Sequence, residues 1–131
     1  MQMLTVKTGE HTEMVDITSD LQAIVRESGV LNGSVVIHVP HTTAAVTINE
    51  NADPDVVHDL LADLERLVPW RQSYYQHGEG NSAAHLKSSL IGCSMSVIID
   101  NGLLVLGTWQ GIYFCEFDGP RTRKVMVKLT E

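Results

Sequence analysis

Short β-branched and apolar runs dominate both ends of this 131-residue chain and constrain its fold more than any other feature. Such runs, bounded by turn residues, predict strands at residues 34–39, 44–48, 95–99, 112–117 and 125–129. The pair Asn101-Gly102 is a hairpin signal, and it predicts a further strand at 103–106. Because hairpin connections join antiparallel neighbours, the pattern predicts an antiparallel sheet.

The middle of the chain carries helix signals, and the clearest begins at Asp53. Asp53 fits the N-cap of this helix and Pro54 fits its first turn. An apolar stripe at helical spacing follows, formed by Val57, Leu60, Leu61, Leu64 and Leu67. The stripe predicts a helix that packs one face against the protein.

Two shorter helices are expected on either side of this one. The first covers residues 21–26, with Ser19 in a capping box and Gly29 as its stop signal. The second follows a polar loop, covers residues 82–90 and ends at Gly92.

The start of the chain completes the predicted architecture. Leu4 and Val6, then residues 14–17, predict two strands, and the turn-like segment 8–11 between them suggests an opening hairpin. Strands at both ends with helices between them favour an α+β fold over a doubly wound parallel sheet. We therefore expect one domain over residues 1–131, an antiparallel sheet or sandwich backed by two or three helices.

Composition excludes several classes of protein. Apolar residues form 44% of the chain and charged residues 19%, a balance typical of globular proteins. No apolar run approaches the roughly 20 residues that cross a bilayer, and no export signal is visible. The formal charge of −7 argues against broad binding to nucleic acid. Cys93 and Cys115 lie in apolar segments without a CxxC spacing, which favours buried free thiols and a reducing, cytoplasmic compartment.

The segment 77–85 concentrates polar groups at the junction of a loop and a helix. These groups are His77, Glu79, Asn81, Ser82 and His85. The small residues at the start of the helix leave its first N–H groups free to hold an anion such as phosphate. Two histidines and a carboxylate also suit zinc, manganese or another divalent ion. Two histidines eight residues apart are not a known metal spacing, so a surface loop with a capped helix is the alternative.

Two further polar clusters adjoin predicted strands. His41, Thr42 and Thr43 stand at a strand end, where side chains commonly point into a site; a Ser/Thr turn with a solvated histidine is the alternative. Glu50 follows the next strand and is a candidate metal ligand or general base.

The last third of the chain offers two candidates. Gln110 is placed to hydrogen-bond a ligand with Trp109 packed beneath it, although core packing explains Trp109 equally well. Arg121 is a candidate for a bidentate phosphate contact, and the alternative for this turn is a solvated hairpin with exposed ion pairs. Three other histidines are interpreted as structural: His11, His38 and His58.

Three long strings occur in order: HTTAAVTINENADPDV, HGEGNSAAHLKSSLIG and NGLLVLGTWQGIYFCEFDGPRTRKV. With them the chain closely resembles the YjbQ-like family, also described as secondary thiamine-phosphate synthases, over nearly its whole length. The resemblance implies a compact α+β subunit that assembles as a homotrimer, with a polar site near or at the subunit interfaces. The matching positions are His41, Thr43, Glu50, His77, Glu79, Asn81, His85, Gln110 and Arg121.

The resemblance also implies a reaction. This is weak formation of thiamine phosphate from a hydroxymethylpyrimidine diphosphate and a thiazole phosphate, which expels pyrophosphate. A divalent ion, zinc, magnesium or manganese, would be held by His77, Glu79 and His85. Phosphate oxygens would be held by Thr43, Asn81, Ser82 and Arg121, and the candidate catalytic residues are His41, Glu50 and Gln110.

Two other classes of function remain open. A metal-dependent phosphohydrolase would use the same groups, with Glu50 or His41 activating a water. The other alternative is a trimeric binding protein without catalysis that holds a small phosphorylated metabolite or a metal.

Overall fold

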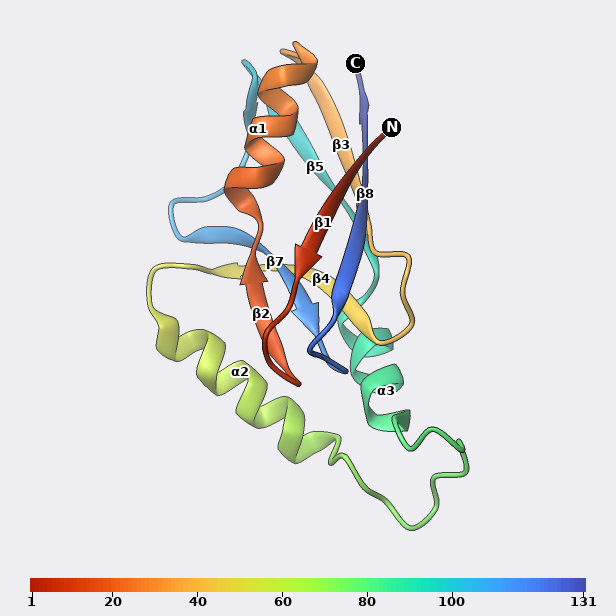
Figure 1. The fold of residues 1–131 in the computed structure, drawn as a ribbon. Coiled ribbons are helices and arrows are strands. Elements are labelled where there is room, and N and C mark those ends of the chain that lie inside the picture. The colour runs from red at the N-terminus through yellow and green to blue at the C-terminus, as the bar shows by residue number, and fades with distance from the viewer.

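The structure is a computed structural model that describes residues 1–131, and it contains three helices and eight strands (Figure 1). The helices are α1 (Thr18–Ser28), α2 (Pro54–Leu67) and α3 (Ser82–Ile91). The strands are β1 (Gln2–Lys7), β2 (Glu13–Asp16), β3 (Gly33–His38), β4 (Ala44–Glu50), β5 (Ser94–Asp100), β6 (Leu103–Leu104), β7 (Gln110–Glu116) and β8 (Thr122–Thr130).

The strands form two antiparallel sheets. The larger has the order β1-β8-β3-β5-β6 and the smaller the order β2-β7-β4. Their inner faces and α1 share one core of 17 buried apolar residues, while the other face of the smaller sheet packs against α2 and α3. The predicted α+β fold, an antiparallel sandwich backed by helices, is therefore confirmed.

The predicted opening hairpin is wrong. β1 pairs with β8 in the larger sheet, whereas β2 pairs with β7 in the smaller one. The turn-like segment between them carries the chain from one sheet to the other, and the Thr8 N–H donates to the Arg121 carbonyl oxygen at 3.0 Å. Local turn residues report a change of direction, but they carry no information on which strand becomes the partner.

The helix ends test the predicted caps. Asp53 caps α2 as expected, because its side chain accepts from the Asp55 N–H. Gly29 ends α1 in the left-handed conformation, with φ 75°. The capping box at Ser19 is wrong, since α1 begins earlier and Asp16 instead accepts from the Thr18 N–H at 2.9 Å. None of the three helices is long and apolar enough to span a membrane.

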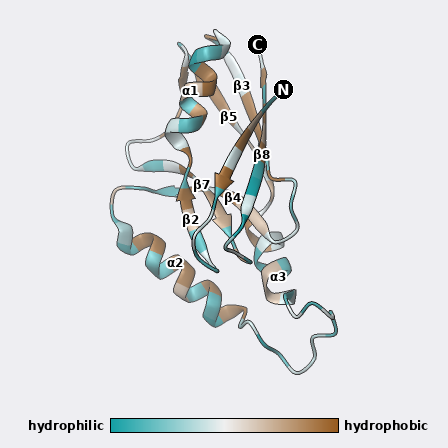
Figure 2. Cartoon of the chain, viewed as in Figure 1, coloured by the Kyte–Doolittle hydropathy of each residue, from teal (hydrophilic) through white to brown (hydrophobic).

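Helix α2 carries the predicted apolar stripe, which Figure 2 shows as brown segments alternating with teal. Val57, Leu61 and Leu64 pack against the small cluster on the smaller sheet. No residue of α2 is fully buried, because the helix lies on the outside of the molecule and only one side of it faces the sheet (Figure 1).

A buried ion pair joins the two sheets. Glu116 at the end of β7 is fully buried, and Arg123 at the start of β8 is 3% exposed. The Nε and Nη2 atoms of Arg123 donate to the two carboxylate oxygens of Glu116. The Thr8 hydroxyl also donates to Glu116, and Arg123 Nη2 also donates to the Thr43 hydroxyl. This network ties together the segments after β1 and before β4.

A second buried charge holds α3 against α2. Lys87 of α3 is 1% exposed, and its Nζ donates to Glu65 Oε2 of α2 at 2.6 Å. The next residue, Ser88, donates its hydroxyl to the Ala44 carbonyl oxygen at the start of β4. Two polar contacts therefore fix α3 on neighbouring elements from one side of the helix.

We predict that Glu116→Gln lowers the free energy of unfolding near neutral pH by about 3–5 kcal/mol, because it leaves the Arg123 charge buried without a counterion. Burial raises the pKa of Glu116, but hydrogen bonds from Arg123, Thr8 and the Asp118 N–H, with the Arg123 charge, hold it below its ordinary value of 4.5. A carboxylate whose pKa is lower in the folded than in the unfolded protein stabilises the folded state at pH values above its unfolded-state pKa. This stabilisation is lost as the pH falls through the folded-state pKa.

Urea unfolding at about pH 7 and about pH 3.5 checks this prediction. The wild type should lose stability between the two values, and the Gln variant should lose measurably less. The exposed Glu27 supplies a matched control, Glu27→Gln. Equal unfolding energies for both variants at neutral pH would contradict the importance of the pair.

We also predict that Glu65→Ala destabilises the protein by about 1–3 kcal/mol, because the ammonium group of Lys87 is left buried without its acceptor. Asp63→Ala is the matched control on the same helix, since it removes an ion pair with Arg66 in which both side chains are about 70% exposed. Such a pair contributes roughly 0–1 kcal/mol. Urea denaturation measures the free energy of unfolding of both variants. Similar losses in the two variants would refute the stabilising role of the Lys87–Glu65 pair.

Candidate functional site

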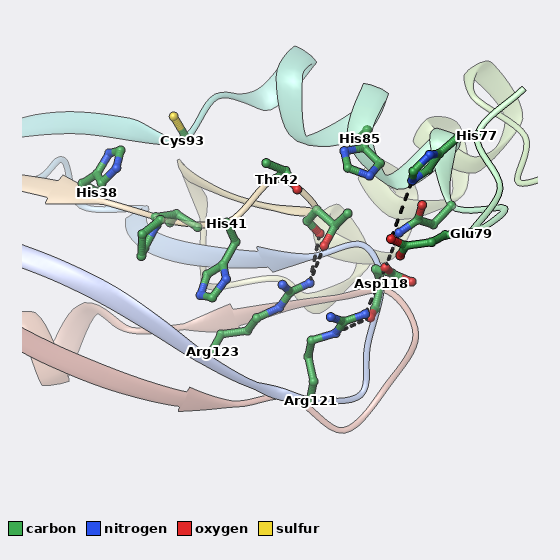
Figure 3. Close-up of a pocket in the computed structure, with 14 residues that line it drawn as sticks. His38, His41, Thr42, His77, Glu79, His85, Cys93, Asp118, Arg121 and Arg123 are labelled. Atoms are coloured by element: carbon green, nitrogen blue, oxygen red, sulfur yellow. Dashed lines mark hydrogen bonds and ion pairs between the residues drawn. The ribbon is translucent and has the colours of Figure 1, made fainter. Parts of the chain in front are cut away.

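A polar cavity of about 640 Å³ opens at the end of the molecule where three loops meet. These are the β3–β4 loop, the segment leading into α3 and the β7–β8 turn. The cavity is lined by His38, Val39, Pro40, His41, Thr42, Thr43, His77, Glu79, Asn81, His85, Cys93, Asp118, Arg121 and Arg123. Figure 3 shows the labelled side chains arranged around it. A cavity with so few apolar side chains suits a charged ligand.

The buried ion pair forms the cationic part of the wall. Arg123, labelled in Figure 3, lines the cavity. Its guanidinium group is fixed by Glu116 and Thr43. Because four hydrogen bonds hold this group, its position is set before any ligand arrives.

His41 stands beside Arg123, in the middle of the β3–β4 loop (Figure 3). Its Nε2 accepts a hydrogen bond from the Lys124 backbone N–H at 3.0 Å. Burial lowers the pKa of His41, the charges of Arg123 and Arg121 lower it further, and Glu116 and the Lys124 contact only partly oppose them. The neutral imidazole is therefore the favoured form near neutral pH.

Asp118 organises the β7–β8 side of the cavity. Its Oδ2 accepts from Arg121 Nη2 at 3.0 Å and from Asn81 Nδ2 at 2.9 Å. The Arg121 Nε also donates to the Asp118 carbonyl oxygen. Asn81 Oδ1 is the one side-chain atom that is both closed to solvent and without a hydrogen-bond partner. The carboxylate thus connects the turn to the start of α3.

His77, Glu79 and His85 form the third part of the wall. The rings of His77 and His85 lie edge to face, with centroids 5.4 Å apart, and His77 Nε2 lies 3.9 Å from Glu79 Oε1. The structure brings these three predicted ligands to one cavity, but no three His, Cys, Asp or Glu side chains converge in metal-binding geometry within the chain. The divalent ion therefore stays a prediction.

The cavity gathers most of the residues singled out in the sequence. His41, Thr43, His77, Glu79, Asn81, His85 and Arg121 all line it. Ser82 lies just outside, in a shallower depression beside Tyr75 and Leu86 that also touches His77 and His85. The Asn81 side chain makes no capping hydrogen bond to α3, and its amide nitrogen instead donates to Asp118.

Glu50 and Gln110 are not brought to this cavity within one chain. They face each other at the opposite end of β4 and β7, six residues from Ala44, which is roughly 20 Å along a strand. Gln110 Oε1 accepts from the Gly107 N–H at 2.7 Å, and the side chain of neighbouring Trp109 is 62% exposed instead of packed in the core. Sequence proximity to the first motif misled the interpretation because β4 carries the chain away from the site.

Besides Val39 and Pro40, four residues of the cavity were not among the candidate site residues: His38, Cys93, Asp118 and Arg123. Strand alternation gave a usable signal for Arg123, since it shares a face of β8 with the fully buried Val125 and Val127. The alternative interpretation of this turn, a solvated hairpin with exposed ion pairs, describes the half-exposed Arg121 but not the buried Arg123. Cys93 was expected to be buried and is exposed, because it lies in the connection before β5; both thiols are free.

Comparisons with known proteins agree with this fold and its motifs. A model of the family described as UPF0047 protein YjbQ-like matches residues 2–131. The UPF0047 protein YugU of Bacillus subtilis is 53% identical over 98% of each chain. A YjbQ/UPF0047 family protein from Clostridium acetobutylicum has a crystal structure that matches with a TM-score of 0.96 at 53% identity, over 99% of this chain and 100% of that one. A conserved hypothetical protein from Thermus thermophilus matches with a TM-score of 0.93 at 43% identity, over 99% and 100%. The chain therefore belongs to the UPF0047 family of YjbQ-like proteins.

Proposed function

We propose that this protein is an enzyme of the thiamine-phosphate synthase type, which condenses a hydroxymethylpyrimidine diphosphate with a thiazole phosphate and releases pyrophosphate. The observation that carries the proposal is the charge arrangement of the cavity. Arg121 and Arg123 supply positive charge on one side, and two imidazoles stand on the other. Such donors stabilise the negative charge that develops on a departing pyrophosphate.

The shape and size of the cavity also support a phosphorylated substrate. Its volume of about 640 Å³ lies in the range for metabolite-sized ligands. Its wall includes Asn81, the residue just before α3, so the N-terminal end of a 10-residue helix lies beside the same region. A helix N-terminus favours phosphate oxygens, and here it acts together with the two guanidinium groups.

Hydrolysis is the weaker candidate because neither of the two expected bases, Glu50 and His41, is placed to activate a water. Glu50 lies at the far end of β4, and His41, although it lines the cavity, has its Nε2 lone pair engaged by the Lys124 N–H. Glu79 is 75% exposed and makes its one close contact with His77. Condensation of two bound substrates needs no activated water, so it fits the groups in the cavity better.

A divalent ion would be held by His77, Glu79 and His85, where it would neutralise diphosphate charge. His77 and His85 already lie ring to ring, whereas Glu79 contacts only His77. A single chain does not supply a complete set of ligands for this ion. The proposed role of the two arginines, which is to stabilise charge on phosphate oxygens, does not depend on the ion.

We propose further that the protein works as a homotrimer in the cytoplasm, with the cavity close to the contacts between subunits. Large apolar side chains exposed in the single chain support this. On the outer face of the larger sheet they are Met3, Val36, Ile98, Leu103 and Val105, and on α3 they are Leu86 and Leu90. Surfaces of this kind mark contacts between proteins.

Product analysis tests the proposed reaction. We expect the purified protein to leave the pyrimidine diphosphate intact when it is given alone, and to release thiamine phosphate and pyrophosphate when the thiazole phosphate is added. Free pyrimidine alcohol with pyrophosphate or phosphate in the first incubation would indicate a hydrolase. Binding of both compounds without any product would indicate a binding protein and would refute the enzymatic proposal.

His85→Ala tests the predicted ion. We expect the variant to lose both the divalent metal retained on purification and the condensation activity, because His85 supplies one of only two imidazoles on that wall. Metal analysis on protein prepared without chelators or added metal measures the first effect. The control is His58→Ala, an exposed residue of α2. Unchanged metal content and turnover in His85→Ala would reject the assignment.

A further inference from the structure

The tautomer of His41 follows from a backbone contact. Its Nε2 accepts the Lys124 N–H at 3.0 Å, so this nitrogen presents its lone pair to the main chain of β8. A neutral imidazole carries one proton, and an accepting Nε2 places that proton on Nδ1. The Nδ1–H group makes no hydrogen bond within the protein, and the residue lines the cavity. His41 therefore presents a donor to the cavity and has no free lone pair.

Arg123 has one unused donor as well. Its Nε and Nη2 make all of its hydrogen bonds, which leaves Nη1 without a partner. Asn81 Oδ1 is the only unpaired side-chain atom closed to solvent, so Nη1 remains open to the cavity that Arg123 lines. The side chain is only 3% exposed, and a free N–H of a guanidinium group makes a stronger hydrogen bond to an anion than a neutral donor does, even though Glu116 pairs with the charge.

Building on the proposed function, we propose that His41 Nδ1–H and Arg123 Nη1 together form an oxyanion-binding site for a phosphate or diphosphate oxygen, in which His41 acts as a neutral hydrogen-bond donor and not as a general base. Figure 3 shows the imidazole beside the guanidinium group. Both donors are fixed by the protein before the ligand arrives, and such preorganised donors stabilise developing negative charge without reorganisation.

The charges around His41 support this role. Burial and the charges of Arg123 and Arg121 lower its pKa, while Glu116 raises it, and the net direction keeps the ring neutral near neutral pH. To act as a base, His41 would have to give up the Lys124 contact and take a second proton at Nε2, close to two guanidinium groups. Arg121 is not part of the proposed oxyanion site, because it pairs with Asp118 and its side chain is 49% exposed.

Nitrogen NMR on the unaltered protein tests the tautomer directly, without any variant or activity. The protonated and unprotonated nitrogens of a neutral imidazole have well-separated ¹⁵N shifts. We expect the proton on Nδ1 near neutral pH, and a shift of that nitrogen when inorganic pyrophosphate is added. A proton on Nε2, or a doubly protonated ring, would overturn the proposal.

Pyrophosphate binding to variants tests the donor role. Asn at position 41 keeps an N–H donor near the place of Nδ1, whereas Ala removes it. We expect His41→Asn to bind pyrophosphate within about threefold of the wild type and His41→Ala to bind about tenfold more weakly, as for loss of a hydrogen bond to a charged group. The exposed His58→Asn is the matched control and should bind normally.

The outcomes separate this inference from the proposed function. If the wild type binds pyrophosphate but the Asn and Ala variants lose equal affinity, the donor role is refuted while the phosphate site stands. If the wild type binds no pyrophosphate, the phosphate site itself is refuted, and the oxyanion role falls with it.

Discussion

The buried contact between Glu116 and Arg123 is the interaction on which the rest of the structure depends. It joins the end of the smaller sheet to the start of a central strand of the larger one, across the turn between β7 and β8. Two buried charges cost desolvation energy, and the cost is partly offset here because Thr8, Thr43 and the Asp118 N–H add further hydrogen bonds to the pair. The same guanidinium group forms part of the cavity wall. One side chain therefore contributes both to sheet assembly and to the charge of the site.

Much of the fold could be read from the sequence because its signals are local. Asp53 and Pro54 specify the start of α2, Gly29 the end of α1, and Asn101-Gly102 the hairpin between β5 and β6. Strand partners are not local information. β1 and β8 lie at opposite ends of the chain, and no turn residue could show that they pair.

The site was predictable to the extent that its residues stand in loops next to strand and helix ends. His41, His77, His85 and Arg121 were found in this way, since loops at the same end of a sandwich converge. Glu50 was misplaced because it is the last residue of the seven-residue strand that begins just after Thr43, and a strand moves the chain farther than sequence distance suggests. Arg123 escaped notice because a charged residue on an apolar face becomes meaningful only when its counterion, here Glu116, is known.

The contacts of α3 give the cavity one firmly held side and one side with few hydrogen bonds to the rest of the protein. Ser88 bonds the start of β4, Lys87 bonds α2, and the fully buried Ala83 and Ala84 allow close approach, so the helix carrying His85 is locked to the strand that follows His41. The preceding loop, residues 71–80, makes hydrogen bonds only within itself and projects from the body in Figure 1. A segment with so few outside contacts opens at low energetic cost. In the proposed function, the locked side would select the anionic group of a ligand, while a shift of His77 and Glu79 on the loop would accommodate ligands of different length.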